Sequence, residues 1–573
     1  MSSLTPSLLP SCPNARTPAF KLRKRILTTS VATLLTLSGP GHLEATEIVK
    51  ASNTNALNTT ISWVGGAIPG TGDVAVWDST VSVPNTSQMG GDLTLQGIKI
   101  TNVGGARNGT NVITIANTNS ANTLTLGAAG IDMSAALQVL VIQSKVNLGA
   151  DQTWNVANAS TNSSAAGLSQ NEDLALLSQA ANTAMNLGGF TLTKTGAGTA
   201  AWSSGWSISN GAFAVNEGVL HIQGGSNRVT TVNNTVNFTV NTGATLRFAS
   251  QSGAGGVSLQ NNAPITLNSG STLALHLNQN NALNLTGNIT VAGNTIWNPF
   301  GAGFTSVLGT FSGSLLGSGN IAYRNTATAA NGFLRFTGDN SAYSGTITLD
   351  GGSNNRNLRL SGVNSGSAAA TWVVGAANTL EIDGTTVSLG TIGGAGTITN
   401  SHATNPAVIN VGAGTFTGTV SNGIAPLSVT KIGSGTLELL GPILYTGATT
   451  VNSGTLLLGP DAAANTSVTV ADGAAFGVKA ADFPATLTLP NLTVGTSTGG
   501  TLVFDLGTFG NLTVPGIAVT NFTAKAPTRL QIFAANLTPG TFPLLDYSNT
   551  IGGLGFNGLT LVLPPRVTGS LVH

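Results

Sequence analysis

Hydrophobic and polar residues alternate in short runs along most of the chain, and turns that contain glycine or asparagine separate the runs. The stretch 429–459 shows this most clearly. Val429-Thr-Lys-Ile-Gly-Ser-Gly-Thr-Leu-Glu-Leu-Leu is followed by Gly441-Pro442 and then by Tyr445-Thr-Gly-Ala-Thr-Thr-Val-Asn-Ser-Gly-Thr-Leu-Leu-Leu-Gly459. A period of two places apolar side chains on one face of a strand, and glycine permits the turns. The pattern therefore predicts short β-strands joined by tight turns.

The same phrase occurs earlier, at 192–222. Lys194-Thr-Gly-Ala-Gly-Thr matches Lys431-Ile-Gly-Ser-Gly-Thr, and Val215-Asn-Glu-Gly-Val-Leu matches Val451-Asn-Ser-Gly-Thr-Leu. Repeated strand–turn units predict a solenoid. With three strands of about five residues in each rung, a rung needs roughly 20–25 residues. The sequence thus predicts an all-β protein, a right-handed parallel β-helix with a β-rich C-terminal segment, and asparagine side chains stacked at its turns.

Composition supports this fold class. The 573 residues include 75 glycines, 41% are hydrophobic, and only 7% are charged. Disordered chains lack apolar residues and carry charge, and Gly, Thr and Asn are weak helix formers. Removal of residues 1–45 takes away five basic residues and one acidic residue, which leaves 16 basic and 19 acidic residues. A chain of this charge has no basic patch for nucleic acid. The single cysteine, Cys12, lies in the same N-terminal segment, so we expect no disulfide beyond it.

These motifs resemble a known bacterial family, the autotransporter-associated β-strand repeat, also called the passenger-associated transport repeat. Its usual form is a Thr-Lys-x-Gly-x-Gly-Thr-Leu strand, a Tyr-x-Gly turn and a Thr-x-Val-x-x-Gly-Thr-Leu strand. The copy at 429–459 matches almost throughout. The copy at 192–222 has Trp202-Ser-Ser-Gly-Trp206 in its middle, and a partial copy at 334–352 contains Tyr343-Ser-Gly-Thr-Ile-Thr-Leu. The resemblance covers about a fifth of the chain and implies a passenger domain whose repeats assist export.

Four segments follow from this pattern. Residues 1–45 are predicted to be a signal peptide, because Lys21-Leu-Arg-Lys-Arg25 precedes an apolar run that is too short to span a membrane; the alternative is a disordered cytosolic N-terminus. Residues 46–90 are an N-terminal capping segment, 91–480 the β-helix with its repeats, and 481–573 a C-terminal β segment. Within the β-helix, residues 166–187 are the one place where we allow a short helix or an excursion loop.

Chemistry-bearing residues are sparse. The isolated histidines make no ligand pair, and no Gly-x-Ser-x-Gly elbow stands out. Many β-helices are polysaccharide lyases or hydrolases, which need clustered carboxylates. Here the acids are scattered singly in turns, where Asp caps its own backbone: Asp339, Asp350, Asp383, Asp461 and Asp472. Calcium-binding nonapeptides and phosphate loops are also absent from the sequence. The sequence predicts no catalytic, cofactor-binding or metal-binding residue.

Two tryptophan pairs leave alternatives open. Trp63 and Trp77 fit a first rung that closes the hydrophobic end of the solenoid, and the alternative is a sugar platform. Trp202 and Trp206 fit core filling or a loop anchor, and the alternative is again stacking on a sugar.

The functional hypothesis is a non-enzymatic structural or passenger protein, secreted or displayed at the cell surface, whose repeats assist export and folding. Its expected partners are the export machinery, through the signal peptide, and cell-surface or glycan partners. The alternative is a polysaccharide-acting enzyme or a carbohydrate-binding β-helix. No apolar run of 18 or more residues occurs near the C-terminus, so we expect no transmembrane anchor there. We expect export by the N-terminal signal alone, and the hypothesis leaves open whether the natural chain continues past His573.

Overall fold

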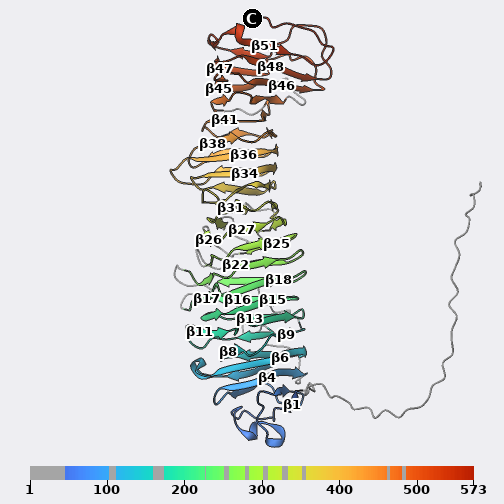
Figure 1. The fold of residues 1–573 in the computed structure, drawn as a ribbon, viewed down its shortest axis with the longest axis vertical. Coiled ribbons are helices and arrows are strands. Elements are labelled where there is room, and N and C mark those ends of the chain that lie inside the picture. The colour runs from blue at the N-terminus through green and yellow to red at the C-terminus, as the bar shows by residue number, and fades with distance from the viewer. Residues whose placement is uncertain are drawn as a thin grey trace, which may run out of the picture. The chain divides into compact units, whose positions relative to one another are not determined.

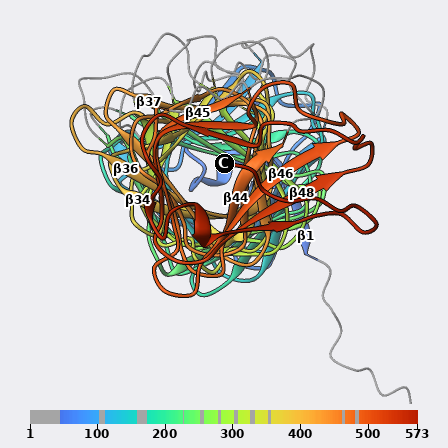
Figure 2. The ribbon, with the colours of Figure 1, turned by 90° about the horizontal axis from the view of Figure 1, so that it is seen from above.

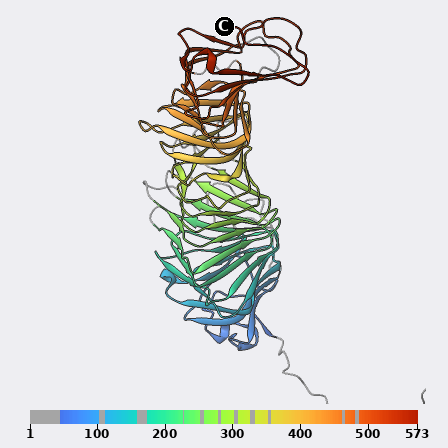
Figure 3. The same cartoon turned by 45° about the horizontal axis from the view of Figure 1, so that its top comes forward.

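The fold was described from a computed structural model. It covers residues 45–101, 111–158, 173–225, 228–250, 257–277, 283–300, 307–324, 333–351, 356–460, 465–479 and 486–573. The predicted signal peptide lies outside the described residues, apart from Ala45. Residues Ala45–His573 form one compact unit, in which successive rungs of β-strands stack on one another (Figures 1 and 3).

The unit is a parallel β-helix, as the sequence predicts. Every pairing between named strands is parallel. One rung consists of β14 (Trp206–Ser209), β15 (Gly211–Val215) and β16 (Val219–Gly224), and the next rung repeats the order as β17, β18 and β19. Viewed from above, the strands surround a common interior (Figure 2). Phe213 pairs with Phe238, 25 residues later, and Leu437 pairs with Leu456, 19 residues later. The rung length is therefore close to the predicted one.

The strands line up in walls along the helix. At the N-terminal end lie β1 (Thr46–Val49), β2 (Asp73–Trp77), β4 (Leu93–Thr101) and β6 (Thr123–Ala135). The first wall continues with β8 (Lys145–Leu148), β11 (Thr183–Asn186), β14, β17 (Thr230–Val232), β20 (Leu259–Asn261), β23 (Leu283–Leu285), β26 (Val307–Phe311), β29 (Phe333–Phe336), β31 (Arg356–Leu360), β33 (Asn378–Ile382), β35 (Thr397–Asn400), β37 (Thr419–Gly423) and β40 (Ile443–Leu444). The second wall comprises β9 (Gln152–Val156), β12 (Thr191–Thr195), β15, β18 (Val236–Val240), β21 (Ile265–Leu267), β24 (Ile289–Val291) and β27 (Leu315–Gly317).

The third wall comprises β3 (Asn85–Gln88), β5 (Val112–Ala116), β7 (Val139–Ile142), β10 (Leu174–Leu176), β13 (Thr199–Trp202), β16, β19 (Thr245–Ser250), β22 (Thr272–Leu277), β25 (Thr295–Phe300), β28 (Ile321–Tyr323), β30 (Thr346–Leu349), β32 (Ser367–Val374), β34 (Thr386–Gly394) and β36 (Ala407–Phe416). Beyond β36 this sheet divides into two walls. One is β38 (Leu427–Lys431), β41 (Thr449–Val451), β43 (Val468–Val470), β45 (Leu487–Val494), β47 (Ile517–Ala524), β49 (Leu545–Tyr547) and β50 (Gly552–Gly553). The other is β39 (Thr436–Leu439), β42 (Thr455–Leu458), β44 (Ala475–Lys479), β46 (Thr501–Gly507), β48 (Thr528–Ala534) and β51 (Leu559–Val562).

The described residues contain no α-helix. Their helical turns are four short 3-10 segments: Thr60–Ser62, Val64–Gly66, Thr118–Ser120 and Phe556–Gly558. The segment 166–187 contains no α-helix where it is described; it holds two short strands, β10 and β11, joined by the bend and turn 177–182. Leu174–Leu176 is fully buried between β7 and β13, and Thr183–Asn186 pairs with β14. Residues 166–172 lie outside the described ranges.

A continuous hydrophobic core runs through the rungs because alternate side chains point inward, and a small second cluster of Val139, Val141 and Ala175 lies apart from it. Aromatic rings stack along the continuous core. Trp154 lies on Trp202 at 5.6 Å between ring centroids, and Phe213 lies on Phe238 at 5.2 Å. Outside the core, asparagines stack from rung to rung as predicted. Asn241 Nδ2 donates to Asn216 Oδ1 at 2.6 Å, and Asn268 Nδ2 donates to Asn241 Oδ1 at 2.6 Å.

Parallel pairing extends into both predicted end segments. β1 already pairs with β2 inside residues 46–90, and β45 pairs with β47 and β47 with β49 inside residues 481–573. The end segments are thus continuous with the helix between them.

Candidate functional site: lysine clamps of the repeats and an outer groove

The lysine of each Thr-Lys-x-Gly repeat makes the same three hydrogen bonds. Lys194 Nζ donates to the carbonyl oxygens of Thr195 at 2.8 Å, Gly196 at 2.7 Å and Glu217 at 3.2 Å. In the second copy, Lys431 Nζ donates to the corresponding carbonyls of Ile432 at 2.7 Å, Gly433 at 2.8 Å and Ser453 at 3.1 Å. We call this arrangement the lysine clamp. It joins the turn after one strand to the turn of the following rung.

The position of the lysine in its strand explains the clamp. Lys194 is fully buried and points into the helix, in register with Trp154 on one side and Val215 on the other. Lys431 is equally buried, between the paired residues Val411 and Val451. Each lysine sits at the end of its strand, so the apolar stem packs in the core while the ammonium reaches the turn carbonyls.

The glycines of the motif fit the clamp closely. Gly454 adopts φ +65°, and a Cβ there would lie 2.4 Å from the Gly435 carbonyl oxygen and 2.8 Å from Lys431 Nζ. Gly218, its counterpart, adopts φ +62° and would meet the Gly196 oxygen at 2.4 Å. Only glycine enters this backbone region without strain. The Val-x-x-Gly turn of the motif therefore packs on the Lys-x-Gly turn of the rung below it.

Burial also changes the acidity of these lysines. Desolvation lowers the pKa of Lys194 to about 8, and it lowers the pKa of Lys431 as well. Lys50, which lies outside the repeats, is fully buried too and has its pKa lowered to about 8. Its Nζ donates to the carbonyls of Ala51 at 2.9 Å and Asn53 at 2.7 Å. A buried lysine at a turn thus occurs near the N-terminal end as well as in two repeats.

The Tyr-x-Gly turn is a second, separable element of the motif. Tyr343 is fully buried, and its hydroxyl donates to the Gly319 carbonyl at 2.7 Å. Tyr445 is equally buried, with its hydroxyl 2.8 Å from Thr449 Oγ1. A Cβ on Gly345 would lie 2.5 Å from the Tyr343 hydroxyl. The copy at 192–222 has the lysine without the tyrosine, and 334–352 has the tyrosine without the lysine.

The tryptophans are core residues. Trp63 is 3% exposed and Trp77 1% exposed, and their rings meet edge to face at 5.8 Å. Trp63 also forms an antiparallel bridge with Lys50, and its Nε1 donates to the Leu57 carbonyl at 2.8 Å. Trp202 and Trp206 are both fully buried. None of the four therefore forms a surface on which a sugar can stack.

The scattered acids make turn contacts. Asp339 Oδ1 accepts hydrogen bonds from the amide and the hydroxyl of Ser341. Asp472 accepts from both donors of Thr496 and both of Ser497, and these bonds hold the pKa of its carboxyl well below the usual range. Asp350 pairs with Arg324 at 3.3 Å, and Asp383 accepts from the Ser361 hydroxyl. Asp461 lies outside the described residues.

The histidines stay apart. His402 Nδ1 accepts from the amides of Thr404 and Asn405 in its own turn, and His573 packs near the ring of Tyr547. His221 and His276 lie on the third wall, whereas His42 falls outside the described ranges. Among the residues that the structure describes, no group of three His, Cys, Asp or Glu side chains is arranged to hold a metal ion.

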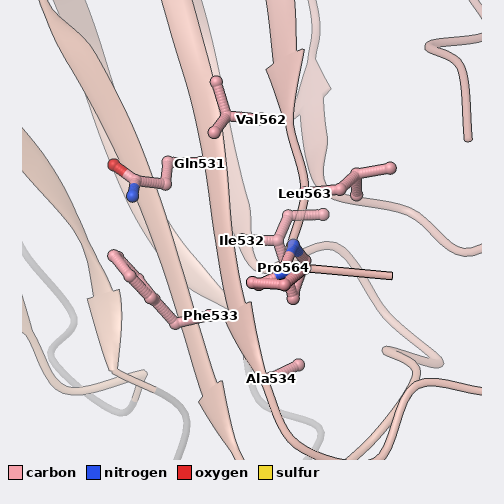
Figure 4. Close-up of a pocket in the computed structure, with 8 residues that line it drawn as sticks. Gln531, Ile532, Phe533, Ala534, Val562, Leu563 and Pro564 are labelled. Carbon is pink, nitrogen blue, oxygen red and sulfur yellow. The ribbon is translucent and has the colours of Figure 1, made fainter. Parts of the chain in front are cut away.

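A shallow groove lies on the outer face of the last rungs. Two adjoining hollows share Gln531 and Phe533. The larger spans about 830 Å³, its open side included. Strands β39, β42, β44, β46, β48 and β51 form its floor, and Figure 4 shows Gln531, Phe533 and Val562 in the smaller hollow.

The floor of this groove is closely packed. Leu457 and Val503 face outward yet are only 5% and 4% exposed. Between them lies Gly477, where a Cβ would come within 2.7 Å of Val503 Cβ. We call this surface the outer groove.

The outer groove contains two carboxylates, but they lie too far apart for glycoside hydrolysis. Glu438 and Asp505 are three strands apart in the register, roughly 14 Å along the helix. Hydrolytic pairs are about 5–9.5 Å apart. Glu438 is also bound to Lys479 at 2.6 Å and accepts from the Thr415 hydroxyl. The outer groove therefore lacks the geometry of a two-carboxylate hydrolase.

A second charged cluster lies on the first wall. Glu381 accepts from Arg359 Nε at 2.6 Å and from Asn357 Nδ2 at 2.6 Å, and the Arg359 guanidinium lies 3.8 Å from the centre of the Phe333 ring. It holds one carboxylate, so it offers no acid–base pair either.

No family model, curated protein or solved structure matches this chain. Within the described residues, none of the helical segments is long and apolar enough to cross a membrane.

Proposed function

We propose that this protein is a non-enzymatic, exported structural protein of the passenger type, and that its repeats assist folding outside the cytoplasm. The observation that carries the proposal is the recurrence of one clamp in two repeats. Lys194 and Lys431 are 237 positions apart, yet they make three corresponding bonds whose lengths agree to 0.1 Å. The motif that suggests the family is thus also a working unit of the fold.

The clamp suits progressive folding. In a solenoid each rung contacts only its neighbours, so a completed rung is a template for the next. A one-residue slip would turn every inward side chain outward. The lysine clamp opposes such a slip because its ammonium binds carbonyls of two successive turns. A chain that emerges from an export channel segment by segment needs this kind of local register control.

A single fractionation experiment tests both the export and the folding role. The full chain is expressed in a bacterium with an outer membrane, and the fractions are examined for N-terminal processing and for protease resistance. We expect wild type to lose its N-terminal segment and to accumulate as a protease-resistant species outside the cytoplasm. Lys194→Met/Lys431→Met should be processed but degraded, because each substitution leaves three turn carbonyls without their lysine donor, at a cost of about 1–3 kcal/mol.

The control is Lys525→Met, which removes an exposed lysine. It should behave as wild type. Unprocessed wild type in the cytoplasm would contradict export, and normal accumulation of the double variant would contradict the role of the repeats. Turnover of pectin or alginate by the purified protein would contradict the absence of enzymatic activity.

A further inference from the structure

We infer that the outer groove binds a linear, uncharged polysaccharide that lies along the helix axis, with Phe533 as its stacking platform and Gln531 as its hydrogen-bonding group. Phe533, the last residue but one of β48, is 49% exposed, and Val562 on the neighbouring β51 is 37% exposed. Gln531 projects from the same side of β48 as Phe533 (Figure 4). An aromatic face next to a planar amide matches a pyranose, which has apolar C–H faces and a rim of hydroxyl groups.

The floor of the outer groove is apolar and its edge carries hydroxyl groups. Leu457, Val503 and Val562 follow one another along one row of the register, with Gly477 and Gln531 between them. Thr436, Thr455 and Thr501 form the adjacent row. Lys479 on β44 reaches across β42 to Glu438 on β39, where its Nζ lies 2.6 Å from Glu438 Oε1.

The dimensions of the outer groove fit a chain of sugars. From β42 to β51 there are four strand steps, or about 19 Å. Each step advances by the spacing of hydrogen-bonded strands. A pyranose unit in an extended chain advances by a similar distance, because its two linking oxygens lie on opposite sides of one six-membered ring. Successive sugars can therefore meet successive strands in the same way.

From β42 to β48 the outer groove offers no free edge to a peptide that adds a strand. Strand addition requires an unpaired sheet edge, whereas the outer groove lies on the face of strands that are paired on both sides from β42 to β48. Only side chains are available to hydrogen-bond a ligand there. Sugar hydroxyls can use the Gln531 amide and the threonine hydroxyls, but a peptide backbone finds no ladder.

The charges select an uncharged polymer. The charged side chains that line the outer groove are Glu438 and Asp505. Lys479 is ion-paired with Glu438 and is also the register partner of Asp505. The exposed Arg529 follows Thr501 in the threonine row. Two carboxylates and two cations therefore balance, so the outer groove has no net charge with which to attract a charged polymer.

Isothermal titration calorimetry of the full chain tests the inference. The probes are cellopentaose, xylopentaose, mannopentaose and laminaripentaose, with pentagalacturonate as the charged comparison. We expect at least one neutral pentasaccharide to bind and pentagalacturonate to bind more weakly. Phe533→Ala and Gln531→Ala should each raise the dissociation constant about tenfold, the effect of losing one stacking or hydrogen-bonding contact.

The matched control is Leu444→Ala, which removes an exposed apolar side chain from β40 on the first wall. It should leave the dissociation constant unchanged. Phe533 and Gln531 are surface side chains, so thermal unfolding of both variants should match wild type. The inference is overturned if no neutral probe binds wild type, if pentagalacturonate binds best, or if both groove variants bind as wild type does.

Discussion

At the scale of single residues, the buried lysines show how a polar side chain can serve a hydrophobic solenoid. Lys50, Lys194 and Lys431 are each fully buried, yet every Nζ has at least two backbone carbonyls as partners. A buried charge is tolerated only when it is hydrogen-bonded. The carbonyl oxygens of a tight turn, for their part, need hydrogen-bond donors. The lysine and the turn therefore satisfy one another.

These lysines predict an unusual dependence of stability on pH. Between pH 8 and 10.5 the folded chain has released the protons of Lys50 and Lys194, whereas the unfolded chain still holds them. The unfolded state then binds more protons, so the free energy of unfolding rises with pH across this window. A neutral amine keeps two donors, so most of the clamp survives deprotonation.

The buried tyrosines act in the opposite direction at higher pH. Burial raises the pKa of Tyr343 and Tyr445. At a pH near 10.0 these two tyrosines ionise in the unfolded chain, but they stay protonated in the folded chain. We expect the urea midpoint of wild type to rise between pH 8 and 10 relative to Lys50→Met/Lys194→Met. Above pH 10 it should fall relative to Tyr343→Phe/Tyr445→Phe. Midpoint differences that stay constant from pH 7 to 11 would show that burial does not shift these groups.

At the scale of elements, alternation and turn glycines were enough to predict the strands. The repeat at 429–459 reads as strand, turn, strand, and the structure places β38 to β42 there. Val139–Ile142 on the third wall is different, because its four apolar residues follow one another without alternation and all four are buried. Leu174–Leu176 was harder to assign, since its leucines are compatible with a helix and three residues carry little periodicity.

The clamp and the outer groove could not be predicted from local pattern. The alternation of Thr191–Thr195 marks Lys194 as an inward position, where a lysine looks like an exception. Its acceptors include a carbonyl more than twenty residues away, that of Glu217, and only the register brings them together. In the same way, the outer groove combines side chains from six strands between 436 and 562. The repeated Lys-x-Gly spacing was the one signal in the sequence.

Gly477 provides a test at this scale. It lies in the middle of β44, and an added Cβ would come within 1.9 Å of the Val503 carbonyl oxygen on β46. Gly477→Ala must therefore push two paired strands apart, which should cost about 1–3 kcal/mol or more. Thermal unfolding followed by circular dichroism should show a lower midpoint. Gly72→Ala is the control, because nothing lies within 4 Å of that position. Equal midpoints for the two variants would contradict the tight approach of β44 and β46.

At the scale of the whole unit, the two ends of the helix differ. Near the N-terminal end, Trp63 packs on Trp77 and is 3% exposed. At the other end, the inward side chains of the last rung are only half buried: Leu545, Tyr547, Leu559 and Leu561. One rung below, Ile517 and Leu530 are buried to 0% and 3% exposure. Because each rung relies on its neighbours, protection from solvent should decline towards the last rung.

Trp63 allows the cap and the cooperativity of the rungs to be measured together. Trp63→Ala removes the ring that packs on Trp77 and the bond to Leu57, at a cost of about 3–5 kcal/mol. Coupling between nearest neighbours should confine the loss, so hydrogen exchange should accelerate in β1 to β4 and stay unchanged in β34 and β36. Trp297→Ala, in the core of the middle rungs, should instead accelerate exchange around β25 and leave β1 and β2 protected. Faster exchange along the entire chain in either variant would mean that the helix unfolds as one cooperative block, and that Trp63 is a global stabiliser instead of a local cap.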